Sequence, residues 1–175
     1  AYDVHQSLQG KDYEQVAWNE WTARSEADTV PGALTFFKYA ASKGIRIYFI
    51  SNRGESERTG TLQNLIKFGF PDASNDHLLL RQTTSGKEIR RQQVMNDHDV
   101  LLLFGDNLSD FSDLFDKKPY EERLAATRRL TTEFGNRFIV LPNPAYGDWE
   151  LSLYQFKSLN LSQKDSAARH WLKSY

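Results

Sequence analysis

The stretch of residues 100–111 constrains the fold of this chain more than any other. It begins with five apolar residues in a row, 100–104, and continues through Gly105 and Asp106 to Asp110. A short run without a polar residue is typical of a strand buried on both faces, as in a parallel sheet. Ligands of open α/β sheets bind beyond the carboxyl ends of such strands, so the stretch predicts a site at the two aspartates.

The spacing of the two aspartates leaves two interpretations open. Asp carboxylates suit Mg²⁺, which usually takes one or two of them together with waters and substrate phosphate. Alternatively, Asp106 or Ser109 is the N-cap of a helix that follows. Other parts of the chain have to distinguish a metal site from a helix cap.

Composition excludes several classes of protein. The 175 residues suffice for one domain with a sizeable core. A net charge of −1 argues against binding of a nucleic-acid polymer, and the absence of cysteine excludes disulfides and thiolate chemistry. The four histidines lack the spacing of a zinc site, and no apolar run approaches the ~20 residues of a membrane span. The sequence opens at Ala1 without a signal peptide, so we expect a processed or excised chain.

Helical and strand patterns alternate along the chain. Helices are predicted at residues 12–27, 33–43, 55–68, 86–96, 119–134 and 162–171, with a loop at 145–150 entering a further helix. Strands are predicted at residues 45–50, 77–80, 100–104 and 137–141. This alternation predicts an α/β fold, a Rossmann-like parallel sheet flanked by helices and joined by right-handed crossovers.

Further polar groups are expected at the same edge of the sheet as the two aspartates. Ser51, Asn52 and Arg53 follow the strand predicted at 45–50, and Lys87 lies at a helix start. A hydroxyl, a cation and metal-binding acids form a set that handles phosphate groups. A lysine at a helix start opposes the helix dipole unless an anion is nearby, which favours a functional role for it. The chain has no evident nucleophile and no glycine-rich nucleotide loop.

Trp18 and Trp21 are three residues apart and therefore share one face of the helix predicted at 12–27. They are either core anchors or, because their neighbours in the sequence are polar, the lining of a cleft.

The chain resembles the haloacid dehalogenase superfamily in three of its motifs. Motifs II, III and IV are similar to Ile50-Ser51-Asn52-Arg53, Ser85-Gly86-Lys87 and Phe104-Gly105-Asp106-Asn107-Leu108-Ser109-Asp110-Phe111. More narrowly, the chain resembles the class C acid phosphatases of the bacterial lipoprotein 5′-nucleotidase type. Trp18-x-x-Trp21, Val30-Pro31-Gly32-Ala33 and the segment 143–150 fit that subgroup, so the similarity extends over nearly the whole chain.

The resemblance implies a single domain over residues 1–175, with a small cap formed by residues 1–29 and part of 110–120. It implies a Mg²⁺-dependent phosphomonoesterase that acts through an aspartyl-phosphate intermediate on substrates such as nucleoside monophosphates. The roles that it implies are Mg²⁺ binding by Asp106, phosphoryl binding by Ser51 and charge neutralisation by Lys87. Asp110 would orient Lys87 or the waters of the metal.

The resemblance also implies residues that bind the rest of the substrate. Asn52 and Arg53 would contact it, and Trp18 and Tyr146 would sandwich its base or aromatic leaving group. It places the intact protein on the outer membrane or in a secreted or periplasmic location, with a lipid anchor upstream of this chain. Its oligomeric state is left open.

One departure from the family concerns the nucleophile. Motif I, Asp-x-Asp, supplies the aspartyl nucleophile and the general acid at the end of the first strand in the family, and this chain has no Asp-x-Asp at the end of a predicted strand; Asp97-His98-Asp99 instead precedes the strand predicted at 100–104. We expect the motif I segment upstream of Ala1 and expect no turnover by the chain alone. The alternatives are a phosphotransferase using the same intermediate and a non-catalytic surface adhesin with a vestigial site.

Overall fold

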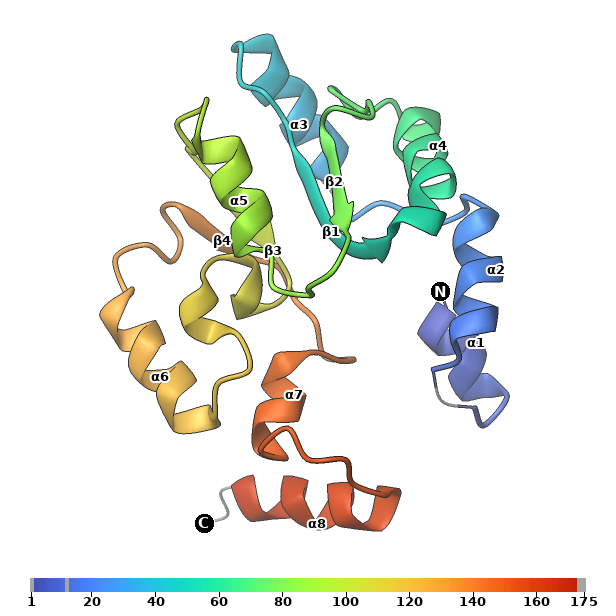
Figure 1. The fold of residues 1–175 in the computed structure, drawn as a ribbon, viewed down its shortest axis with the longest axis vertical. Coiled ribbons are helices and arrows are strands. Elements are labelled where there is room, and N and C mark those ends of the chain that lie inside the picture. Colours follow the sequence, from blue (N-terminus) through green and yellow to red (C-terminus); the bar gives the residue numbers. More distant parts are fainter. Residues whose placement is uncertain (1, 12, 173–175) are drawn as a thin grey trace. The chain divides into compact units, whose positions relative to one another are not determined.

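The computed structural model describes residues 2–11 and 13–172 and has an α/β architecture (Figure 1). The chain divides into two compact units, Ala1–Ser85 and Gly86–Tyr175, and each contains one pair of parallel strands. The predicted parallel α/β fold is therefore confirmed. The assignment of residues 1–29 and of part of 110–120 to a cap stays a prediction. Among the helices described, none is long and apolar enough to cross a membrane.

The first unit contains the parallel strands β1 and β2. Its elements are α1 (Tyr2–Leu8), α2 (Gln15–Ala23), α3 (Ala33–Ser42), β1 (Phe49–Gly54), the 3₁₀ turn η1 (Glu55–Glu57), α4 (Arg58–Phe68) and β2 (Leu78–Arg81). Phe49 lies opposite Leu78 and Gly54 opposite Arg81, with an irregularity in the ladder between them. Leu78 and Leu80 of β2 are almost fully buried and form the centre of this unit's core.

The first strand begins later than the sequence predicts. The prediction placed it at residues 45–50, whereas β1 begins at Phe49. The backbone N–H of Ile47 donates to the carboxylate of Asp72 at 2.9 Å, and the carbonyl of Ile47 accepts from Nδ1 of His77 at 2.7 Å. Side chains thus satisfy the backbone groups that a ladder would use, and strand pairing starts only at Phe49, whose N–H donates to the His77 carbonyl.

The helices of the first unit follow the predicted pattern with shorter ends. The helix predicted at 33–43 is α3, and the helix predicted at 55–68 is η1 followed by α4. Gly69 ends α4 with a φ of 73°, a left-handed conformation that glycine adopts readily. The helix predicted at 12–27 is shorter in the structure, where it is α2, and Asp12 lies outside the described residues.

The second unit contains the parallel strands β3 and β4. Its elements are α5 (Glu88–Met95), β3 (Leu103–Gly105), the 3₁₀ turns η2 (Leu108–Asp110) and η3 (Asp113–Phe115), α6 (Tyr120–Arg129), β4 (Phe138–Val140), α7 (Asp148–Leu153) and α8 (Leu161–Trp171). Leu103 lies opposite Phe138 and Gly105 opposite Val140. The ring of Phe138 stacks on Phe111 at 5.0 Å between ring centres, and both side chains are buried.

The apolar run at residues 100–104 forms a strand of the parallel pair, but its burial on both faces was wrongly predicted. Leu101 is 59% exposed and Leu102 is 37% exposed. The ladder with β4 starts at Leu103, whose N–H donates to the carbonyl of Arg137 at 2.8 Å. Residues 100–102 precede the first partner on β4, so an uninterrupted apolar run does not become an uninterrupted strand.

Candidate active site

The polar cluster of the first unit lies on the last half of β1. The sequence predicted Ser51, Asn52 and Arg53 beyond the end of a strand, but the ladder continues to Gly54, so all three lie within β1. The Ser51 hydroxyl is half-buried and accepts the N–H of Arg53 at 3.2 Å. Asn52 is exposed. As consecutive residues of a strand, the hydroxyl and the amide point to opposite faces.

Arg53 connects this strand to the aromatic residues of α2. Its guanidinium carbon lies 5.7 Å from the ring centre of Trp18 and 5.6 Å from that of Trp21, within the range of a cation–π interaction. Its Nη1 also donates to the hydroxyl of Thr61 at 2.9 Å. Trp18 and Trp21 contact each other with ring centres 5.2 Å apart. Both indoles are half-buried and pack against the buried ring of Tyr2, with ring centres 5.1 Å and 6.1 Å apart, so the choice between a core anchor and a cleft lining stays a prediction.

Glu57 is a residue of this cluster that the sequence analysis missed. Its carboxylate accepts the indole N–H of Trp18 at 2.7 Å with one oxygen and the backbone N–H of Gly54 at 2.6 Å with the other. Only 7% of the residue is exposed. Glu57 thus fixes the orientation of the Trp18 ring and the end of β1 together. No local pattern marks this glutamate, because its partner Trp18 is 39 residues away in the sequence.

Lys87 and Asp110 form the central ion pair of the second unit. Lys87 is the N-cap residue of α5, and its Nζ lies 2.6 Å from Oδ1 of Asp110. The two side chains are only 19% and 10% exposed. Asp110 therefore supplies the anion that a lysine at a helix start needs.

The second carboxylate oxygen of Asp110 organises the loop that follows β3. It accepts the backbone N–H groups of Asp106 and Asn107, each at 3.0 Å. The N-cap of η2 is Asn107, so the alternative that Asp106 or Ser109 takes that position was wrong. Gly105 is required here, because a side chain on it would collide with the Asp110 side chain.

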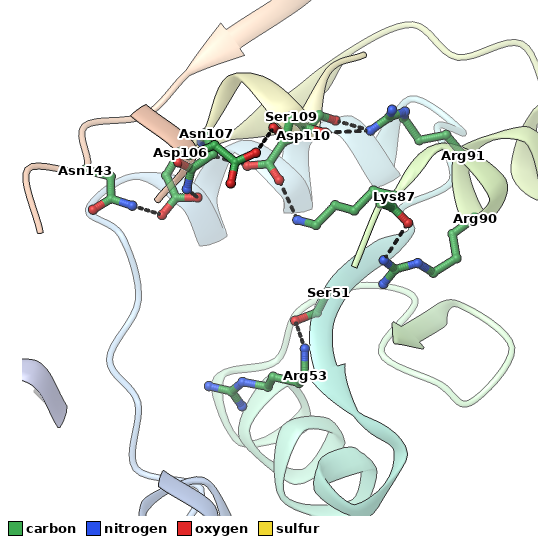
Figure 2. A network of polar contacts seen from close by, with 12 residues as sticks. Ser51, Arg53, Lys87, Arg90, Arg91, Asp106, Asn107, Ser109, Asp110 and Asn143 are labelled. Carbon is green, nitrogen blue, oxygen red and sulfur yellow. Dashed lines mark hydrogen bonds and ion pairs between the residues drawn. The ribbon is translucent and has the colours of Figure 1, made fainter. Parts of the chain in front are cut away.

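Asp106 lies between Asn143 and Asp110 on this loop (Figure 2). Its carboxylate accepts Nδ2 of Asn143 at 2.9 Å and Nδ2 of Asn107 at 3.3 Å. Burial and then the neighbouring charge of Asp110 raise the pKa of Asp106 above its ordinary value. A bound cation would favour the charged form and oppose both effects.

A divalent cation fits the residues present around Asp106. The side-chain oxygen Oδ1 of Asn107 is buried against Gly147 and has no hydrogen-bond partner among the described residues, while its Nδ2 donates to Asp106. Within residues 2–11 and 13–172, no three His, Cys, Asp or Glu side chains gather into a metal cluster. Mg²⁺ usually binds through one or two carboxylates with waters and phosphate oxygens, and Asp106 meets that need.

The segment after β4 joins Asp106 to Tyr146. Asn143 donates to Asp106 and accepts the backbone N–H of Tyr146 at 3.3 Å with its side-chain oxygen. Tyr146 is 54% exposed. Asp148 accepts the Ser109 hydroxyl at 3.0 Å and so ties this segment to η2. Neither Asn143 nor Asp148 was predicted as a site residue, although both lie in the segment 143–150 that the resemblance singled out.

The second unit thus brings Lys87, Asp106 and Asp110 together, and the first unit brings Arg53 to Trp18. The site combines a lysine held by one carboxylate with a second carboxylate of raised pKa, at the carboxyl end of a parallel strand. Such an α/β site is suited to a phosphate group and a divalent cation. Residues 1–149 match the model of the HAD superfamily, subfamily IIIB (Acid phosphatase). The chain belongs to this family, which is one of phosphoric monoester hydrolases.

Solved and curated relatives agree with the family. The structure of the class C acid phosphatase from Bacillus anthracis is 41% identical with a TM-score of 0.92, covering 100% of this chain and 75% of that one. The same enzyme with tungstate bound is 40% identical, also with a TM-score of 0.92 and the same coverage. Acid phosphatase 1 of Solanum lycopersicum is 23% identical over 141 residues, 77% of this chain. The chain spans about half, 48%, of that tomato protein.

Proposed function

We propose that the protein containing this chain is a Mg²⁺-dependent acid phosphatase that hydrolyses small phosphomonoesters, nucleoside monophosphates among them. The observation that carries the proposal is the arrangement of the β3 loop, where Lys87 is held by Asp110 beside the carboxylate of Asp106. Phosphoryl transfer is catalysed chiefly by positioning and by electrostatic stabilisation, and this loop offers both. Phosphatases of the haloacid dehalogenase superfamily generally use a divalent metal.

In this proposal each residue of the second unit has a distinct role. Asp106 would hold Mg²⁺, which supplies positive charge to phosphoryl oxygens when bound. Lys87 has three ammonium N–H donors, of which the ion pair with Asp110 uses one, so donors remain for phosphoryl oxygens. Asp110 keeps that ammonium group in place. Its own negative charge is balanced by Lys87 and by two backbone N–H groups.

Residues 51–53 and Trp18 of the first unit, and Tyr146 of the second, are proposed to recognise the substrate. Ser51 would donate its hydroxyl to a phosphoryl oxygen, and Asn52 and Arg53 would contact the remainder of the phosphate ester. Trp18 and Tyr146 would each stack on a base or an aromatic leaving group. Stacking of a base on an aromatic ring contributes ~1–3 kcal/mol by alanine substitution.

The nucleophile is proposed to lie outside this chain. The sequence has no cysteine, and its Asp97-His98-Asp99 precedes β3 and does not follow the end of a strand as the family's motif does. We propose an aspartate of an Asp-x-Asp segment, which would form the aspartyl-phosphate intermediate and release the alcohol. From the resemblance alone we also propose an extracytoplasmic location with a lipid anchor.

The test compares two purified forms, this chain alone and the same chain preceded by its Asp-x-Asp segment. Phosphate release from a nucleoside monophosphate is measured with Mg²⁺ and after chelation with EDTA. We expect activity only in the longer form and only with the metal. Turnover by the short chain, with contaminating phosphatase excluded, would show that the nucleophile is wrongly assigned. Full activity of the longer form after chelation would remove the role of Asp106.

A further inference from the structure

Arg91 is a buried cation that the roles proposed above do not use. It lies on α5, one helical turn after Lys87, and the residue is 4% exposed. Residues four apart lie on one face of a helix, so Lys87 and Arg91 face the same neighbour. Burying a guanidinium group is costly unless its N–H groups are satisfied. Its partners therefore indicate what this arginine does.

Those partners are carbonyl oxygens of the same loop that Lys87 binds. Nη1 of Arg91 donates to the carbonyl of Ser109 at 3.1 Å and to the carbonyl of Asp110 at 2.9 Å (Figure 2). Helix α5 thus contacts Asp110 twice, once at its side chain through Lys87 and once at its main chain through Arg91. The Arg91 contacts add to the hydrogen bonds that the turn makes within itself, from the N–H of Asp110 to the carbonyl of Asn107 and from the N–H of Phe111 to that of Leu108.

Glu88 holds the other side of the guanidinium group. Its Oε2 accepts Nη2 of Arg91 at 2.6 Å and Nε at 3.1 Å. Burial alone would raise the pKa of Glu88, but hydrogen bonds from Gln92 and Arg91 and the charge of Arg91 outweigh it, and the net pKa is lowered. Glu88 therefore stays ionised and keeps the planar guanidinium aimed at the two carbonyls.

The position of the Asp110 main chain controls the position of Asp106. The carboxylate of Asp110 accepts the backbone N–H groups of Asp106 and Asn107, so a shift of its Cα carries both residues with it. An arginine that fixes the carbonyls of Ser109 and Asp110 therefore fixes the carboxylate of Asp106 indirectly. Partners beyond the first shell of a metal typically change its affinity 10–100-fold when they are removed.

We infer that Arg91, held by Glu88, is a positioning residue that sets the metal affinity of Asp106 and the placement of Asp110. The inference rests on the proposed role of Asp106 as the metal ligand. It assigns Arg91 no contact with substrate. If Arg91 has this role, its substitution lowers the Mg²⁺ affinity of the protein by more than the accompanying loss of folding stability can explain.

The test measures Mg²⁺ binding to the full-length protein by calorimetry for Arg91→Met, Arg91→Lys and Asp106→Asn. We expect Arg91→Met to weaken Mg²⁺ binding about tenfold or more. Arg91→Lys keeps the charge without the planar pair of donors, so its affinity should fall between those of Arg91→Met and wild type. It also serves as the variant to measure if Arg91→Met does not fold. High Mg²⁺ should restore the phosphatase activity of Arg91→Lys.

The matched control is Tyr154→Leu, which removes another buried side chain of the second unit whose hydroxyl donates to Glu150. We expect it to lower the melting temperature and to leave Mg²⁺ affinity unchanged. Equal loss of affinity in Tyr154→Leu and Arg91→Met would reduce Arg91 to a stabilising residue. The same conclusion would follow if Arg91→Met bound Mg²⁺ within about twofold of wild type while Asp106→Asn abolished Mg²⁺ binding. If Asp106→Asn itself left Mg²⁺ binding intact, the proposed function would fail, and the inference with it.

Discussion

Asp106→Asn should change the pH dependence of stability and the response to Mg²⁺ at the same time. The pKa of Asp106 is raised by burial and by the charge of Asp110, so the folded chain holds this proton more tightly than the unfolded chain. The stabilisation that the proton provides is complete below the unfolded pKa and is lost as pH rises through the folded pKa. An amide does not titrate, so the variant should gain stability relative to metal-free wild type as the pH rises from acid to neutral.

Mg²⁺ should stabilise the wild type and not the variant. A ligand at one hundred times its Kd adds ~2.7 kcal/mol to the free energy of unfolding. For a chain of this size that corresponds to a rise in melting temperature of roughly 5–11 °C. A neutral amide is a poorer ligand for a hard cation than a carboxylate, so most of this rise should disappear in Asp106→Asn.

The measurement is a set of melting curves of the full-length wild type and variant, at acid and neutral pH, with EDTA or with Mg²⁺. The matched control is Asp113→Asn, an exposed aspartate of the same unit, which should keep the full Mg²⁺ response. Retention of that response in Asp106→Asn would refute the metal role. A stability difference between variant and wild type that does not change with pH would refute the electrostatic account of Asp106.

Four further substitutions test the remaining roles. Lys87→Ala should lower kcat by roughly 10²–10³, as loss of one preorganised electrostatic donor does, and a rate near wild type would make Lys87 a structural cation. Trp18→Ala or Tyr146→Ala should raise KM for nucleoside monophosphates roughly five- to 150-fold, the equivalent of one stacked base, and should leave KM for a small aliphatic phosphate unchanged. Equal losses for both substrates with a large drop in melting temperature would make these rings core anchors. Glu57→Gln keeps one acceptor but presents an N–H to either Trp18 or Gly54, so it should raise KM for nucleoside monophosphates and shift the tryptophan fluorescence. An unchanged spectrum and KM would show that Glu57 does not orient Trp18.

Periodicity and turn residues were enough to predict which elements exist. The helices α3 and α8 lie where the apolar spacing placed them, and β3 and β4 form the expected parallel pair. Strand ends were predicted less well, because the partners of the backbone decide them. Residues 45–48 have the composition of a strand, yet Asp72 and His77, far along the chain, take the hydrogen bonds of Ile47.

The sequence predicted those residues of the candidate site that lie in recognisable local motifs. Lys87, Asp106 and Asp110 lie in recognisable segments, and the structure brings them together, while their catalytic roles stay predictions. Glu57, Asn143 and Arg91 were missed because their meaning depends on a partner in another element. Glutamate and arginine are usually exposed, so the sequence gives no sign that Glu57 and Arg91 are buried.

In the proposed function, the charges of the β3 loop would favour binding of a cation and a phosphate group together. Lys87 neutralises Asp110, and two backbone N–H groups complete the environment of that carboxylate, which leaves Asp106 as the uncompensated negative charge. A phosphate dianion approaching the loop alone would meet that charge. A divalent cation on Asp106 would reverse the sign of the local charge, so that the phosphate would face the cation and the ammonium group of Lys87 together. Burial, and then the charge of Asp110, raise the pKa of Asp106, and in the proposed role a bound cation would offset both.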